Sequence, residues 1–184
     1  LALKERGVTN ITIADSPGGL FTQGILKNVY SVCGLKPLSE HATLNLDTSW
    51  REVKTPEGFC VPYFNILNVI ADADYIINVA KLKTHTMTTI SAGIKNLFGA
   101  IPGLQKPEMH YRFPDVNDFS NMLIDLSLLI KPQITIIDAV DGMEGDGPNA
   151  GTPKRMGLTF ASRDMYTQDC IASELMGIPM ESVP

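Results

Sequence analysis

The residues best suited to chemistry lie in one stretch, NVAKLKTHTMTTISAGIKNLFGAIPG, which spans residues 78–103. It holds three amines, one imidazole and a dense set of hydroxyls: Lys81, Lys83, Lys95, His85, Thr84, Thr86, Thr88, Thr89 and Ser91. Lys106 follows, and no carboxylate occurs between Asp74 and Glu108, although the whole chain has a formal net charge of −5. Cationic and hydroxyl side chains without a neutralising acid favour a small anionic ligand, such as a phosphate or a carboxylate.

Individual roles can be assigned within this stretch. We predict that His85 is the catalytic residue, because neighbouring lysines disfavour its charged form and neutral imidazole is the form that a general base or metal ligand requires. We expect one ring nitrogen of His85 to bond a protein acceptor and the other to face a cleft. The residues predicted to bind a substrate or cofactor are Lys81, Lys83, Thr84, Lys95 and Asn96. The alternatives are solvated lysines, a polar loop histidine, and a helix-terminal Lys95 that stabilises the helix dipole.

The elements around this stretch predict where it lies. The apolar run Tyr75–Val79 is typical of a buried parallel strand, and KLKTHTMTT would then be the loop at its carboxyl end. We expect a short helix over Ile90–Phe98, capped by Thr88 or Thr89 and ended by Gly99. In open α/β sheets, ligands bind at the carboxyl ends of strands, which favours a site in this loop.

A second turn of the same kind occurs near the start of the chain. Asn10–Asp15 is predicted to be a strand, residues 16–19 a Ser-Pro-Gly-Gly turn, and Leu20–Cys33 an amphipathic helix. Asp15 and Ser16 are therefore candidate binding residues, with helix capping as the alternative for Ser16. We expect Asp15–Ser16, Lys83–His85 and Asp138–Asp141 to converge on one edge of the sheet.

The remaining chain predicts alternating helices and strands. We expect short strands within residues 41–62, a loop over Pro102–Pro114, strands at Ile134–Val140 and Met156–Ser162, and helices at Tyr63–Ala73, Val116–Lys131 and Met165–Met176. Asp164 is the predicted cap of the last helix. This order predicts an α/β protein, a three-layer α/β/α sandwich with a mostly parallel sheet.

An acidic loop follows the strand at Ile134–Val140. Its carboxylates include Asp138 and Asp141, which are candidate ligands of a divalent metal. The spacing of the acids does not fit an EF-hand. The run GDGPNAG resembles a dinucleotide-binding motif, but Pro148 and Pro153 interrupt it and a strand follows, so we do not expect nucleotide binding through these glycines.

Composition sets the class of protein. The 184 residues suggest one α/β domain, residues 1–184, and the opening LALKERG suggests a fragment of a longer protein that lacks its amino-terminal segment. No apolar run is long enough to span a membrane, and no basic stripe points to nucleic acid. The three scattered cysteines, Cys33, Cys60 and Cys170, predict reduced thiols in the cytoplasm and supply no CxxC pair for an iron–sulfur cluster.

Three ordered motifs resemble a known family: INVAKLKTHTMTTISAGIKNLFGAIPG, IIDAVDGMEGDGPNAGTP and ASRDMYTQDCIASELMGIP. The chain is identified by them, from about Asp15 to Pro179, as a member of the domain of unknown function 362 family. This resemblance implies a prokaryotic protein that often carries a ferredoxin-like module, although the cysteine cluster of such a module is absent from this sequence. The spacing of His85, Lys95 and the turn Pro102-Gly103 is also similar to lactate-racemase-like proteins, in which a histidine is the acid or base and a lysine holds a nickel-pincer nucleotide.

Two functional classes follow. The first is an enzyme or cofactor-dependent domain, in which His85 transfers protons and lysines hold an anionic substrate or a nucleotide-type cofactor. The second is a non-catalytic binding or interaction domain, coupled to an iron–sulfur or ferredoxin-like partner elsewhere in the full protein.

Overall fold

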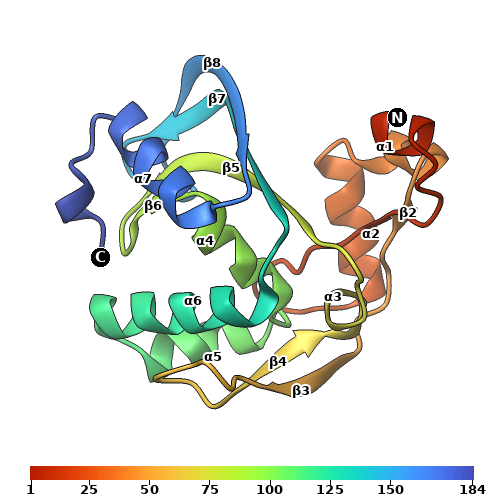
Figure 1. Ribbon diagram of the computed structural model, residues 1–184, viewed down its shortest axis with the longest axis horizontal. Helices are drawn as coiled ribbons and strands as arrows, with labels where there is room; N and C mark the ends of the chain where they lie inside the picture. Colours follow the sequence, from red (N-terminus) through yellow and green to blue (C-terminus); the bar gives the residue numbers. More distant parts are fainter.

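The computed structural model describes residues Leu1–Pro184 and is built around a four-stranded sheet of order β6-β5-β7-β8 (Figure 1). β5 (Ile77–His85) and β7 (Ile134–Glu144) are parallel, whereas β6 (Thr89–Ser91) and β8 (Thr152–Ser162) run antiparallel to their neighbours. Short connections join β5 to β6 and β7 to β8, and such connections allow only antiparallel pairing. The expected mixture of helices and strands is confirmed, but the sheet has mixed orientation and is not mostly parallel.

Two smaller sheets and several helices surround this sheet. β1 (Thr12–Ile13) pairs in parallel with β2 (Thr43–Leu44), and β3 (Trp50–Lys54) pairs antiparallel with β4 (Tyr63–Leu67). The α-helices are α1 (Ala2–Glu5), α2 (Gln23–Val32), α3 (Asn68–Ala71), α4 (Gly93–Asn96), α5 (Gln105–Arg112), α6 (Val116–Ile130) and α7 (Met165–Leu175). The 3-10 helices are η1 (Lys36–Glu40), η2 (Leu97–Ala100) and η3 (Met180–Ser182). The amino-terminal elements α1, α2 and β2 lie at the opposite end of the molecule from α7 and the carboxyl terminus (Figure 1).

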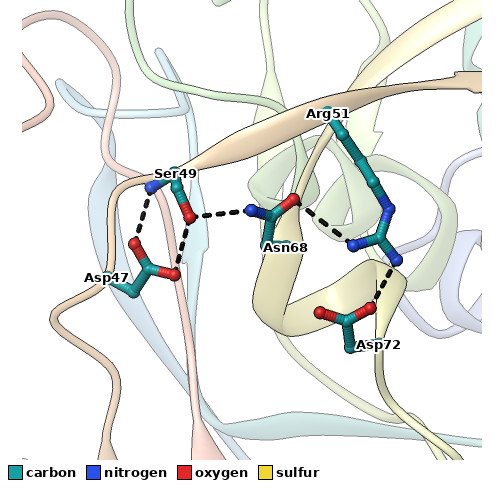
Figure 2. A network of polar contacts seen from close by, with 5 residues as sticks. All are labelled: Asp47, Ser49, Arg51, Asn68 and Asp72. Atoms are coloured by element: carbon teal, nitrogen blue, oxygen red, sulfur yellow. Dashed lines mark hydrogen bonds and ion pairs between the residues drawn. The ribbon is translucent and has the colours of Figure 1, made fainter.

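The helix expected over Tyr63–Ala73 is wrong in its first half. Tyr63–Leu67 forms β4, which pairs with β3 along its whole length; Phe64 and Ile66 are buried with the period of a strand between the more exposed Tyr63 and Asn65, and Leu67 at the strand end is buried as well. Only Asn68–Ala71 is helical. A polar network links β3 to this short helix: Asn68 bonds Ser49, and Arg51 contacts both Asn68 and Asp72 (Figure 2). The β3–β4 hairpin and α3 are thereby held together at the surface.

Two expected loops are regular structure. Most of KLKTHTMTT belongs to β5, which continues to His85 because β6 pairs with its last three residues, Lys83–His85. The expected helix over Ile90–Phe98 is divided into β6, α4 and the start of η2. Pro102–Pro114 is not a loop either, since α5 occupies its centre and buries Met109. The helices α6 and α7 are confirmed, with Asp115 and Asp164 as their side-chain caps.

Two apolar clusters form the core. The larger one joins β4, η2, α5 and α6 through side chains that include Phe64, Phe98, Met109 and Phe119. The smaller one lies between the main sheet and α7, and contains Ala80, Leu82, Ile137 and Ala172. Residues of β5 alternate between the sheet faces, so Ala80 and Leu82 are buried while Val79 is 62% exposed on the other face. Within this chain, helices therefore cover one face of the sheet more completely than the other.

Asp125 ties the larger cluster to the β3–β4 connection. Its carboxylate is fully buried in α6 and accepts the backbone N–H groups of Phe59, Cys60 and Val61. Burial alone would raise the pKa of Asp125, but these three N–H donors and the Cys60 thiol outweigh it and lower the pKa. Burial and the carboxylate hydrogen bond raise the pKa of the Cys60 thiol to about 12.

We predict that Asp125→Asn lowers the free energy of unfolding by roughly 2–4 kcal/mol at neutral pH, because an amide replaces a buried charged acceptor of several N–H groups. A lowered pKa means that this contribution is present above the unfolded pKa, about 3.9, and disappears as the pH falls through the folded value. Urea unfolding at several pH values measures both effects. Asp118→Asn on the same helix is the control and should change stability by less than about 1 kcal/mol; equal losses in both variants would contradict the role of Asp125.

Candidate functional site

A polar cavity of about 340 Å³ lies beside the end of β5. The loop after β1, helices α4 and α5, the 3-10 helix η2 and the β7–β8 loop complete its wall. Its polar lining residues are Asp15, Lys81, Lys83, His85, Ser91, Lys95, Asn96, Lys106 and Asn149. A larger cavity, about 420 Å³, lies between β8 and α7, but no side chain in its wall is titratable. The charged cavity is therefore the candidate site.

The strand period of β5 explains which predicted residues meet here. Lys81, Lys83 and His85 alternate along the strand and share one face, which lines the cavity. Thr84 points to the opposite face, where its hydroxyl donates to the carbonyl of Gly145. The predicted ligand-binding Thr84 thus fixes the β7–β8 loop, and that loop brings Asn149 to the cavity.

Helix α4 is held in place by side chains from two other elements. The amide of Asn78, buried in β5, donates to the carbonyl of Gly93 at 2.8 Å and accepts from Asn96 at 2.7 Å. Asp169 of α7 accepts the N–H groups of Gly93 and Ile94 at 2.7 and 2.8 Å. A Cβ on Gly93 would lie 2.9 Å from the Asp169 carboxylate, so this approach requires glycine. These bonds set the position of Lys95 at the cavity.

The expected cap by Thr88 or Thr89 is wrong. The Thr88 hydroxyl donates to the carbonyl of Ile90, and the Thr89 hydroxyl donates to the carbonyl of Ser182. Asp169, which is 76 residues away from Gly93 in sequence, caps α4 instead. Burial raises the pKa of Asp169 to about 6, although its two N–H donors act in the opposite direction.

Lys95 lies in an environment that disfavours its charge. Burial, and then the charges of Lys106 and Lys83, lower its pKa to about 8. Its Nζ atom lies 4.3 Å from the ring centroid of Phe98 and 4.7 Å from that of Phe119. Lys95 forms no ion pair and no hydrogen bond with another side chain or the backbone. Its ammonium group is therefore without an anionic partner in the protein.

Lys106 also lines the cavity, although it was not among the binding residues predicted from the sequence. Burial lowers its pKa to about 8, and Asp15 acts in the opposite direction. Its Nζ donates to the carbonyl of Ser16, so α5 is joined to the loop after β1. The signal in the sequence was its place inside the segment without carboxylates.

The turn after β1 supplies Asp15 to the cavity and buries Ser16 beside it. The Ser16 hydroxyl is buried without a hydrogen-bond partner, and its backbone N–H donates to Asp15 at 2.7 Å. Thr22, and not Ser16, caps the helix α2. Asp15 is the one carboxylate that lines the cavity.

His85 has one ring nitrogen fixed by the backbone. Its Nδ1 accepts the N–H groups of Met87 and Thr88, at 3.0 and 3.3 Å. The expected protein acceptor is thus replaced by two donors, and Nδ1 must be unprotonated. The neutral ring then carries its hydrogen on Nε2, which has no protein partner. Burial, followed by the charges of Lys95, His110 and Lys83, lowers the pKa of His85 to about 4.

The two candidate metal ligands, Asp138 and Asp141, form ion pairs with different partners. Asp138 lies opposite Lys81 in the β5–β7 pairing and forms an ion pair with it at 2.8 Å. Asp141 pairs with Arg155 across the β7–β8 ladder at 3.2 Å. No group of three or more His, Cys, Asp or Glu side chains has a geometry that could hold a metal ion. Asp138 does not line the cavity itself but pairs with Lys81, which does. Asp141 instead pairs with Arg155 within the β7–β8 hairpin.

Comparison with known proteins places these features in a family. The family model described as Domain of unknown function (DUF362) matches residues 1–174. A thylakoid-associated protein of Synechocystis sp. is 37% identical over 114 residues, which cover 61% of this chain and 36% of that relative. The alignment thus spans about a third of the relative's length. No solved structure matches the chain. None of its helices has the length and apolarity needed to cross a bilayer.

We predict that Asp169→Asn removes a pH dependence from folding. Because burial raises the pKa of Asp169 to about 6, its contribution to stability is fully present below the unfolded pKa of about 3.9 and is lost as the pH rises through about 6. The wild-type free energy of unfolding should therefore gain on the order of 2–3 kcal/mol relative to the variant between about pH 7.5 and about pH 4. Chemical denaturation across this range measures the difference. Glu174→Gln on α7 is the control, and a similar pH profile in Asp169→Asn and wild type would contradict the prediction.

A second prediction concerns the tautomer of His85. Nitrogen-15 NMR at neutral pH should show a neutral ring that is protonated at Nε2, because two backbone N–H groups occupy Nδ1. The ring should stay neutral down to about pH 5. His85→Gln identifies its resonances by their loss. Protonation at Nδ1 at neutral pH would be incompatible with the hydrogen bonds from Met87 and Thr88.

Proposed function

We propose that this chain, which belongs to the Domain of unknown function (DUF362) family, binds a small anionic ligand in the cavity at the end of β5. The observation that carries the proposal is the unpaired, half-buried ammonium of Lys95, with Lys83 and Lys106 close enough to lower its pKa. Taking a charge out of water without a partner is costly, and a bound anion offsets that cost. Lys83 forms no ion pair either, so two cavity lysines lack a protein counter-ion.

The role proposed for His85 follows from its tautomer. Nε2–H is a hydrogen-bond donor that can hold an oxygen of the ligand, while the ring itself remains uncharged. This favours polarisation of a carbonyl or phosphoryl oxygen over proton abstraction by His85, since the lone pair of Nδ1 is engaged. His85 would thus serve as an electrophilic catalytic residue in an enzyme, or as a specificity determinant in a binding domain.

The other predicted binding residues have graded roles in this proposal. Asn96 lines the cavity, and its side-chain amide already donates to Asn78 and to the carbonyl of Val79. Lys81 is shared with Asp138, so it contributes less free charge than Lys83 or Lys95. Asp15 would accept a hydroxyl or amine of the ligand, because a carboxylate does not attract the anionic end.

We expect phosphate to stabilise the protein and Lys83→Ala/Lys95→Met to lose this effect. At a phosphate concentration of ten times the dissociation constant, mass action adds about 1.4 kcal/mol, or a melting-temperature increase of roughly 3–5 °C. Methionine preserves the apolar stem that packs on the phenylalanine rings. Differential scanning fluorimetry at constant ionic strength measures the shift, and isothermal titration calorimetry measures the binding.

The control is Lys27→Ala/Lys36→Ala, which removes the same formal charge from exposed positions outside the cavity. It should keep the phosphate shift. If both double variants respond as the wild type does, the shift reflects general salt exclusion and the anion site is refuted.

The context of the cavity in a full protein is a further part of the proposal. A ferredoxin-like partner module, if present, must be supplied by other segments, because Cys33, Cys60 and Cys170 are free and dispersed in this chain. Free thiols are consistent with the proposed cytoplasmic location. A non-catalytic binding domain would bind phosphate but convert no substrate. An enzyme would do both, so a turnover assay distinguishes the two functional classes.

A further inference from the structure

We propose that Lys95 is a nucleophilic amine that forms an imine with a small carbonyl compound bearing a carboxylate or phosphate group. This inference rests on the proposed anion site and goes beyond it, because it assigns a covalent step and a substrate class. The cavity, about 340 Å³, is large enough for such a molecule.

The contacts of the cavity lysines single out Lys95. Lys81 is held by the carboxylate of Asp138, and Lys106 donates to the carbonyl of Ser16. Lys95 projects over the faces of both Phe98 and Phe119, with Nζ 4.3 and 4.7 Å from the two ring centroids, whereas Lys106 Nζ lies 5.8 Å from the centroid of Phe98. The rings exclude water from one side of the amine and offer no hydrogen-bond acceptor that would tie up its lone pair once the proton has left. The other side faces the cavity.

The surroundings also favour an uncharged amine. A lysine attacks a carbonyl only in its neutral form, and an apolar pocket with a second cation nearby is a known way to populate that form. At Lys95 the apolar surface comes from the two phenylalanines and the cations are Lys106 and Lys83. With a pKa of about 8, the Lys95 amine is neutral in roughly a tenth of the molecules at pH 7, compared with well under a hundredth for an ordinary surface lysine.

The step balances without an oxidant or reductant. The lone pair of Lys95 Nζ attacks the carbonyl carbon, a C–N bond forms, and the C–O π bond opens toward oxygen. Both hydrogens of the amine then leave with that oxygen as water, and a C=N bond replaces the C=O bond. His85 Nε2–H is the donor available to stabilise negative charge on the oxygen while the carbinolamine forms.

The remaining charges of the cavity suit the anionic part of the substrate. Lys83 has no protein counter-ion, and Lys106 has only a backbone carbonyl and the nearby Asp15. A carboxylate or phosphate bound by these two amines would orient the carbonyl toward Lys95. The arrangement therefore favours 2-oxo acids and phosphorylated aldehydes or ketones over uncharged carbonyl compounds.

Reductive trapping tests the inference. The intact chain is incubated with pyruvate, or separately with dihydroxyacetone phosphate, and sodium cyanoborohydride near pH 7, and the modified lysines are mapped by peptide mass spectrometry. We expect Lys95 to be labelled at least about tenfold more than Lys27, because more of its amine is neutral. Phosphate should suppress this labelling by competing for the anion site, whereas acetone, which lacks an anionic group, should label Lys95 poorly.

Two variants control for charge and folding. Lys95→Arg keeps the positive charge without the reactive amine and should abolish site-specific labelling while retaining phosphate binding by calorimetry. Lys27→Arg should leave the labelling of Lys95 unchanged. Circular dichroism melting verifies that each variant is folded.

The outcomes separate this inference from the anion site. Phosphate binding with labelling spread evenly over surface lysines, or with none on Lys95, overturns the imine and leaves the proposed function standing. If the wild-type chain does not bind phosphate, the proposed function and the imine are both overturned. Labelling concentrated on Lys106 also overturns the assignment to Lys95.

Discussion

The capping of α4 by Asp169 is the contact on which the geometry of the cavity depends. A four-residue helix is too short to be stable by itself, so its position must come from tertiary contacts. The Asp169 carboxylate holds the first two N–H groups of this helix, and Asn78 holds its first carbonyl. Lys95 therefore projects from a segment that is fixed at its beginning by α7 and along its length by β5.

Burial shifts the pKa values of Asp169 and Lys95 in opposite directions. Burial raises the pKa of Asp169 and lowers the pKa of Lys95, because low polarity disfavours both charged forms. Asp169 is compensated by two N–H donors, whereas Lys95 has no carboxylate partner. Asp169 is therefore a structural carboxylate, whereas the Lys95 ammonium has no partner in the protein.

The cavity brings together the amino-terminal part of the chain, the helical part and the main sheet. The loop after β1 contributes Asp15, α5 contributes Lys106, and β5 contributes Lys81, Lys83 and His85. The bond between Lys106 and the Ser16 carbonyl connects the amino-terminal part to the helical part. All of these elements lie within residues 1–174, the part of the chain that matches the Domain of unknown function (DUF362) family.

The sequence by itself determined much of the residue content of the site. The segment without carboxylates, residues 75–107, contains the four cavity lysines and His85, and composition alone identified it as a cationic region. The amphipathic helix α6 and the capped helix α7 were also predictable, because their apolar period and their Asp caps are local signals.

Other features were decided only by tertiary structure. β5 extends to His85 because β6 pairs with its end, and Tyr63–Leu67 is a strand because β3 pairs with it. The cap of α4 comes from Asp169, and the environment of Lys95 comes from Phe119 of α6, both distant in sequence. Local propensity cannot specify such contacts, because strand pairing and desolvation depend on which distant segments pack together. The sequence determined which charged side chains were available. The packing of α6, α7 and β6 around β5 decided which of these side chains are removed from water and which have no oppositely charged partner.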